Sequence, residues 1–149
     1  MTEKQDAILI GCDHGAYALK ETIKTWLENQ PLPVKDIGTH DETSVHYPDY
    51  GRSVASAISR GEYRRGILLC GTGLGMSMVA NRFPGVRAAL CTETFAAEKS
   101  RSHNNANILV LGGRVTGPDL AIEIVRTWLE TPFDGGRHQE RLDMFDRLA

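Results

Sequence analysis

Five short hydrophobic runs recur along the chain, each followed by turn residues and then by a helical pattern. The runs cover residues 7–10, 34–37, 66–69, 87–90 and 108–111. Short apolar runs bounded by turn residues are typical of buried strands. Strands that alternate with helices form a parallel sheet whose two faces are both covered. The pattern therefore predicts an α/β fold built on five parallel strands.

Hydrophobic residues at helical spacing mark the segments between these runs. One apolar face lies within residues 16–27, a second within 50–58, and the clearest within 120–129. Residues 46–50 are typical of a turn and a helix start, and a helix is expected to begin near Met76. Beyond Pro132 the tail differs in character, because two glycines precede a short helix with Arg137 and Arg141 on one face. With no linker, repeat or low-complexity segment, residues 1–149 are expected to form a single domain.

Composition excludes several classes of protein. The 149 residues are 41% hydrophobic and 24% charged, with a formal net charge of −2 and no block of like charges. This balance argues against nucleic acid or a membrane surface as a partner. There is no apolar signal core at the N-terminus and no run near the length of a membrane span. Three cysteines without paired spacing indicate a reducing, cytoplasmic setting and no zinc site.

Polar and reactive residues follow the predicted strands. Asp13 and His14 come after the first strand, Cys70 ends the third, Glu93 follows the fourth and Arg114 follows the fifth. Ligands of parallel α/β sheets bind beyond the carboxyl ends of the strands. We therefore expect these side chains to converge on one edge of the sheet as a candidate site.

The segment from Cys70 to Ser77 has the most informative composition. Its glycines leave backbone N–H groups uncovered between a strand and a helix, which favours an anion site. A thiol beside such donors could act, as a thiolate, as a base or nucleophile. The alternative is a cysteine that packs as a small hydrophobe before a tight turn. The segment alone leaves both interpretations open.

Other candidates also have a structural alternative. Asp13 could orient substrate or simply cap the following helix. His103, in the polar stretch 102–107, could be an acid/base or a surface residue. Arg137, His138 and Arg141 could clamp a phosphate or form a solvated face.

Rival nucleotide and phosphate motifs fit less well. The glycine spacing is G-x-G-x-G instead of G-x-G-x-x-G, although Glu93 stands near the place of a ribose-binding acid. The Gly-Lys-Ser/Thr ending of a Walker loop is absent. A cysteine phosphatase loop would have arginine in place of Met76, and a receiver domain would have aspartate in place of Cys70.

The chain resembles the B-type ribose-5-phosphate isomerases, a family that includes allose- and galactose-6-phosphate isomerases. The matching stretches span nearly the whole chain, in order: 11–14, 47–50, 70–73, 102–104, 112–114 and 135–138 with Arg141. The resemblance implies a three-layer α/β/α, Rossmann-like domain with a C-terminal helix. It also implies a homodimer or dimer of dimers whose active sites lie between two subunits.

The resemblance also implies roles by position. Cys70 matches the base of one branch of the family, whereas the other branch has glutamate at the position of Met76. The enediolate would be held by Thr72 and by the loop amides, which include those of Gly71, Gly73 and Gly75. The remaining matches are His103 for ring opening with Asp13 nearby, Asn104 and Tyr47 for substrate contacts, and His14, Arg137 and Arg141, with Arg114 as a neighbour, for the phosphate. His103, Asn104 and the two tail arginines would come from the partner subunit.

The chemistry that the resemblance implies suits these residue types. Aldose–ketose isomerisation needs a base for a carbon-bound proton, donors for an oxyanion, and an acid/base that opens the sugar ring. The residues supply these groups without a metal or cofactor. The expected activity is interconversion of ribose 5-phosphate and ribulose 5-phosphate. The alternatives are a six-carbon aldose 6-phosphate as substrate, or a non-catalytic module that binds a phosphosugar or nucleotide.

Overall fold

The computed structural model describes residues 3–148 and contains the predicted five-stranded sheet. The strands are β1 (Ile8–Cys12), β2 (Val34–Asp36), β3 (Arg65–Cys70), β4 (Ala88–Leu90) and β5 (Ile108–Gly112). All neighbouring strands are parallel, in the order β2-β1-β3-β5-β4. From β1 the chain turns first to β2 on one side and later to β3 on the other. The switch point where α/β sheets bind ligands therefore lies between β1 and β3.

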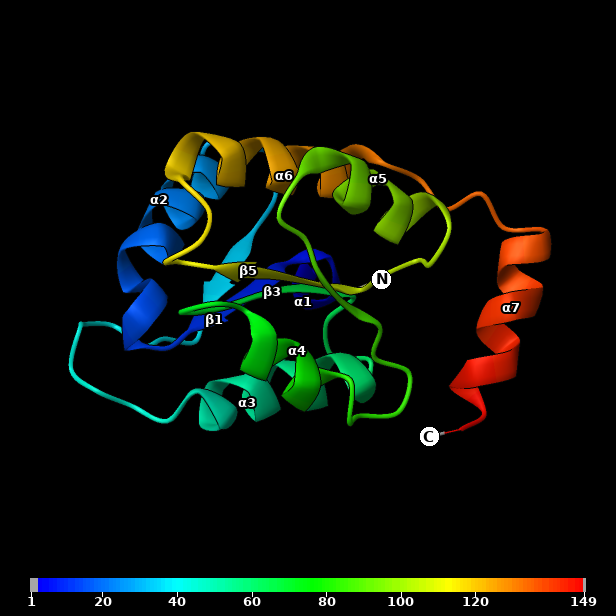
Figure 1. Cartoon of the computed structure of the whole chain (residues 1–149), viewed down its shortest axis with the longest axis horizontal. Coiled ribbons are helices and arrows are strands. Elements are labelled where there is room, and N and C mark those ends of the chain that lie inside the picture. The colour runs from blue at the N-terminus through cyan, green and yellow to red at the C-terminus, as the bar shows by residue number, and fades with distance from the viewer. Residues whose placement is uncertain (1–2, 149) are drawn as a thin grey trace.

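Helices cover both faces of the sheet, as the alternating pattern predicts (Figure 1). One layer holds α2 (Tyr17–Glu28), α5 (Thr94–Ser102) and α6 (Pro118–Glu130), and the other holds α3 (Tyr47–Ser59) and α4 (Leu74–Ala80). A short α1 (Glu3–Asp6) precedes β1, and α7 (Arg137–Asp146) ends the chain. The three-layer α/β/α architecture is thus confirmed, with α4 beginning two residues before Met76.

Two hydrophobic cores result from the alternation of side chains along the strands. In β1, Ile8 and Ile10 pack beneath α2 and α6, whereas Leu9 packs against α3. In β3, Leu69 belongs to the first core and Cys70 to the second. Cys70 therefore points toward the α3 and α4 face at the end of its strand.

Helix α5 lies where the alternation of strands and helices predicts a helix, but none of the predicted hydrophobic faces falls on it. Its buried residues are small, namely Ala97, Ser100 and Ser102, so it carries no hydrophobic stripe. Its N-terminus is capped by Glu93, whose carboxylate accepts hydrogen bonds from the amides of Phe95 and Ala96 at 2.6 and 2.7 Å. Helix capping accounts for this acidic residue, which removes a feature that favoured dinucleotide binding.

Helix α7 stands beside the sheet at the end where the strands begin (Figure 1). It buries only His138 and Leu142, and Asp146 pairs with Arg87 at 3.2 Å. Met144 and Leu148 are 74% and 85% exposed. A helix with so little buried surface has apolar area available for a second subunit, and that docking stays a prediction.

Candidate active site

The loops after β1, β3 and β5 meet at the carboxyl edge of the sheet, as the sequence predicts. The amide of Arg114 donates to the carbonyl of Gly71 at 2.9 Å. One terminal nitrogen of the Arg114 side chain lies 3.5 Å from the place where a Cβ on Gly71 would stand. The other lies 3.5 Å from the place where a Cβ on Gly15 would stand. An exposed cation therefore lies over the turns that follow Cys70 and Asp13.

Asp13 is positioned by its own turn. Its side chain is 8% exposed and accepts a hydrogen bond from the amide of Gly15 at 3.0 Å. This contact caps the 3-10 helix His14–Ala16 that leads into α2. The capping interpretation is thus confirmed, and the carboxylate is fixed at the switch point.

His14 is held by the long loop between β2 and α3. Its Nδ1 accepts a hydrogen bond from the amide of Val45 at 3.1 Å. Because Nδ1 is the acceptor, the ring proton of the neutral histidine lies on Nε2, which is left to donate to a ligand. The same loop is anchored at its start by buried Lys20, which binds Asp36 at 2.7 Å and the carbonyl of Thr39 at 2.8 Å. Burial alone would raise the pKa of Asp36, but the Lys20 hydrogen bond holds it below its usual range.

Cys70 lies at the centre of this edge, between sheet and glycine loop. Its side chain is 5% exposed, and its sulfur accepts a hydrogen bond from the amide of Gly73 at 3.1 Å. Gly73 has φ +83°, a left-handed conformation that favours glycine, and a Cβ there would lie 2.5 Å from a methyl of Leu90. The hydroxyl of Thr72 accepts from the amide of Leu74 at 3.2 Å. Within residues 3–148, the loop amides left to meet an oxyanion are those of Gly71, Thr72 and Gly75.

Tyr47 closes the loop from the α3 side. A Cβ on Gly75 would overlap the phenol carbon that bears the hydroxyl of Tyr47, so the ring packs where only a glycine leaves space. Met76, one residue further, is fully buried in the core beneath α3. Tyr47 therefore lies beside the Cys70 loop, whereas Met76 serves packing.

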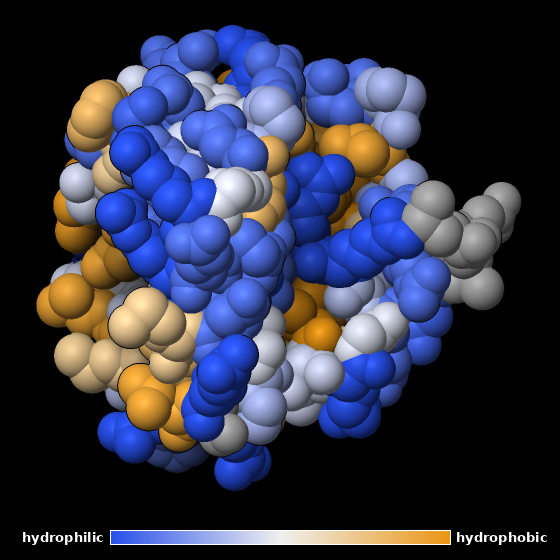
Figure 2. Space-filling model, turned by 90° about the vertical axis from the view of Figure 1, so that its right-hand side faces the viewer, coloured by the Kyte–Doolittle hydropathy of each residue, from blue (hydrophilic) through white to orange (hydrophobic). Residues whose placement is uncertain are grey.

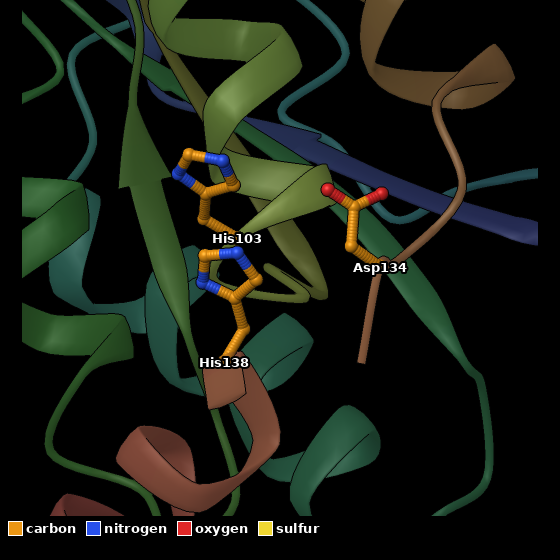
Figure 3. A group of neighbouring side chains, drawn as sticks. All are labelled: His103, Asp134 and His138. Atoms are coloured by element: carbon orange, nitrogen blue, oxygen red, sulfur yellow. The ribbon is translucent and has the colours of Figure 1, made fainter. Parts of the chain in front are cut away.

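The other predicted site residues gather at the opposite end of the molecule. His103 caps the C-terminus of α5, and its ring stacks on that of His138 with centroids 4.2 Å apart and an angle of 11° between planes (Figure 3). Asn104 follows it on the surface, and Arg137 and Arg141 are exposed on α7. His138 therefore stacks on His103. The sequence-based hypothesis that His138 clamps a phosphate together with Arg137 and Arg141 does not predict this contact.

Electrostatics disfavours the charged form of His138. Burial lowers the pKa of His138, and His103, Arg137 and Arg141 lower it further. Within the described chain, ligand atoms of His103, Asp134 and His138 lie within 4.8 Å of one another, close enough to hold a metal ion (Figure 3). The two arginines oppose a cation there, so the arrangement suits an anionic ligand better.

One chain therefore does not unite all the predicted residues. Helix α5 starts after β4 and ends before β5, so His103 lies at the edge where strands begin, whereas Cys70 lies where they end. A strand of five or six residues separates the two edges by about 17–20 Å. A site that contains both groups requires two chains.

Cys12 and Cys91 are buried thiols outside this chemistry. Burial raises the pKa of Cys12 to about 12 and that of Cys91 to about 11. At pH 8 their thiolate fractions should be about a hundredfold to a thousandfold below that of a free thiol. Native protein treated with iodoacetamide should leave both unmodified, while unfolded protein is labelled at both, as peptide mass mapping would show. Labelling of either at the rate of a free cysteine would contradict this burial.

Comparison with known proteins shows the family and the fold of the chain. The model of the Ribose/Galactose Isomerase family matches residues 8–145. A ribose-5-phosphate isomerase B structure from Clostridium thermocellum is 52% identical, with a TM-score of 0.93 over 95% of this chain and 96% of that one. Ribose-5-phosphate isomerase B of Escherichia coli is 45% identical over 91% of both chains. D-erythrulose-4-phosphate isomerase of Pectobacterium atrosepticum is 47% identical over 87% of this chain and 86% of its own.

Fold, site and relatives together define an α/β sugar-phosphate isomerase. The chain belongs to the Ribose/Galactose Isomerase family. It is thus an enzyme, and the alternative of a non-catalytic binding module is set aside. No helix within residues 3–148 is long and apolar enough to cross a membrane.

Proposed function

We propose that the protein interconverts ribose 5-phosphate and ribulose 5-phosphate through an enediolate, with Cys70 as the base. The observation that carries the proposal is the place of Cys70. Its sulfur lies at the switch point of the sheet and accepts a hydrogen bond from the amide of Gly73, and the Arg114 side chain lies beside the neighbouring Gly71. The relatives named as ribose-5-phosphate isomerases support the choice of substrate.

The proposed proton transfer uses one sulfur and a ring of donors. The thiolate of Cys70 removes the proton from C2 of the open-chain aldose, and the electron pair forms the C1–C2 double bond. Negative charge moves to the oxygen on C1, where the amides of Gly71, Thr72 and Gly75 donate hydrogen bonds. The thiol then returns the proton to C1, the electron pair of the C2 O–H bond forms the C2 carbonyl, and the hydroxyl proton passes to the oxygen on C1. This leaves the ketose and regenerates the thiolate. Fixed donors aimed at developing charge are the largest single contribution in many enzymes.

The complete pocket in this proposal is assembled from two subunits in a homodimer or dimer of dimers. His14 and Arg114 approach the phosphate from the chain that carries Cys70. Arg137 and Arg141 complete the phosphate grip from the partner, with His103 and Asn104 at the sugar ring. Within one chain, His103 and the tail arginines lie at the opposite edge of the sheet from Cys70, and this separation supports a pocket shared by two subunits. The three free, buried cysteines agree with a reducing, cytoplasmic setting.

His103 is proposed to open the furanose ring, with Asp13 nearby. His103→Asn should slow turnover of ribose 5-phosphate by about 10²-fold or more, because ring opening loses its acid/base. Proton exchange from solvent into ribulose 5-phosphate needs no ring opening and should fall far less. Both rates are measured by nuclear magnetic resonance in deuterated water. If exchange falls as far as isomerisation, His103 acts in the proton transfer itself.

The substrate is tested by comparing kcat/KM across chain lengths. Purified protein should turn over ribose 5-phosphate with a higher kcat/KM than allose 6-phosphate, galactose 6-phosphate or D-erythrulose 4-phosphate. The four-carbon substrate is included because one relative at 47% identity is named for it. A higher kcat/KM for another of these phosphates would replace the proposed substrate and keep the isomerase chemistry.

A further inference from the structure

A second cavity lies at the edge of the sheet where the strands begin, away from Cys70. Its volume is about 820 Å³, within the range of pockets that take small organic ligands. Figure 2 looks onto this end of the molecule, where hydrophilic side chains border hollows with hydrophobic residues inside. Neither Arg137 nor Arg141 lines the cavity. It is therefore separate from the proposed substrate site.

Positive charge dominates the lining. Four of the lining residues are arginines, against two acidic residues: Arg64, Arg65, Arg87 and Arg101 against Asp6 and Glu130. Asp6 lies 3.6 Å from Arg64, and Arg87 pairs outside the lining with Asp146 at 3.2 Å. The two inner arginines, Arg65 and Arg101, form no ion pair within residues 3–148. The cavity thus holds cations without matching carboxylates.

The partners of Arg65 and Arg101 are neutral oxygens. Arg65 donates to the carbonyl of Leu129 at 3.2 Å, and Arg101 donates to the side chain of Asn105 at 2.9 Å and to the carbonyl of Ala106 at 2.6 Å. A guanidinium has five donors, so these contacts leave others available. Burial lowers the pKa of both arginines, and neighbouring arginines lower it further, whereas Asp6 acts in the opposite direction on Arg65. A negative group in the cavity would relieve that repulsion.

Two buried donors in this region lack an acceptor. They are Nε of Arg101 and Nε1 of Trp128, a fully buried residue whose ring lies 5.9 Å from the guanidinium carbons of both Arg65 and Arg101. Buried donors of native proteins are almost always paired. Within residues 3–148 neither donor has an acceptor, and Trp128 does not itself line the cavity, so the polar region behind the lining is incompletely satisfied.

We propose that this cavity binds a small organic anion that carries a phosphate group. The phosphate oxygens would meet Arg65 and Arg101, because guanidinium groups bind phosphate by parallel hydrogen bonds. The organic part would contact the apolar side of the cavity, which is lined by Leu32, Ile58, Tyr63, Leu129 and Pro132. The excess of arginines disfavours a metal cation. Nothing in this proposal depends on the reaction that the other site performs.

Phenyl phosphate and inorganic phosphate are suitable probes, since they share the phosphate group and differ in the apolar part. Titration calorimetry uses the Arg137→Ala/Arg141→Ala chain, which lacks the tail arginines of the proposed substrate site. Phenyl phosphate should bind saturably, with one site per chain, and at least about threefold more tightly than inorganic phosphate. Each variant is also checked by circular dichroism and thermal unfolding.

Two arginine variants then locate the site. In the same background, Arg101→Gln should weaken phenyl phosphate binding about tenfold or more, as expected for a lost charge-assisted contact. Arg64 is half exposed at the rim of the cavity, and Arg64→Glu should also weaken phenyl phosphate binding about tenfold or more. This second variant allows the measurement even if Arg101→Gln does not fold. The matched controls are Arg126→Gln and Arg126→Glu on α6, outside the cavity lining, and these should bind within about twofold of the background.

Several results would overturn the proposal. One is the absence of saturable phenyl phosphate binding at millimolar concentrations. Another is binding that the folded cavity variants and the Arg126 controls share equally, which would place the anion elsewhere. Equal affinity for the two probes would remove the organic part of the ligand and so contradict the proposed ligand class.

Discussion

Cys70→Ala is expected to lower kcat for ribose 5-phosphate by about 10²–10⁴-fold, the range for a lost general base. The sulfur is the proposed proton carrier, and the glycine loop beside it should keep its position when the sulfur is removed. Because the phosphate contacts are untouched, KM should change little. Steady-state kinetics of the purified variant gives both constants.

Cys91→Ala is the matched control for this change. Its thiol is also buried at a strand end, and burial raises its pKa to about 11, so it has no proposed part in the reaction. The control should keep kcat within about twofold of the wild type. If Cys70→Ala also turned over at that rate, the base would have to be another residue.

Arg141→Ala is expected to reduce kcat/KM for ribose 5-phosphate by about 10- to 150-fold. Each charge-assisted hydrogen bond contributes about 1.5–3 kcal/mol, and the loss is felt in the transition state as well as on binding. Arg141 is exposed on α7 and forms no ion pair within the described residues, so little else changes.

Two comparisons make this prediction specific. Unphosphorylated ribose has no phosphate to hold, so its slow turnover should be much less affected by Arg141→Ala. Arg147→Ala, which changes another exposed arginine at the end of α7, should leave kcat/KM for ribose 5-phosphate nearly unchanged. An equal loss for both substrates would show that Arg141 acts on folding or assembly instead of on the phosphate.

Much of the fold is predictable because buried parallel strands need continuous apolar runs. The runs that became β1, β3 and β5 are buried on both faces of the sheet and stand out in the sequence. Helix α5 does not, since its buried face consists of Ala97 and two serines. A helix that packs through small residues carries no hydrophobic period to detect.

The candidate site also combines contacts that the sequence predicts with contacts that it does not. Asp13, Cys70 and Arg114 are predictable as neighbours because the ends of parallel strands share one edge. The stacking of His103 on His138 is not, since it depends on how the tail returns to α5. The contact of His14 with Val45 likewise depends on the path of a long loop. Such contacts are set by tertiary docking, which local patterns do not encode.

Subunit mixing distinguishes a pocket shared between two chains from a pocket built within one chain. A Cys70→Ala chain is mixed with an Arg137→Ala/Arg141→Ala chain under conditions in which mass spectrometry shows subunit exchange. In a mixed dimer, the pocket with intact Cys70 receives intact arginines from its partner, while the other pocket lacks both. Random exchange of equal amounts should therefore restore about a quarter of wild-type activity from two nearly inactive parents. Proven exchange without recovery would place the arginines and Cys70 in the pocket of one chain and rule out the shared site.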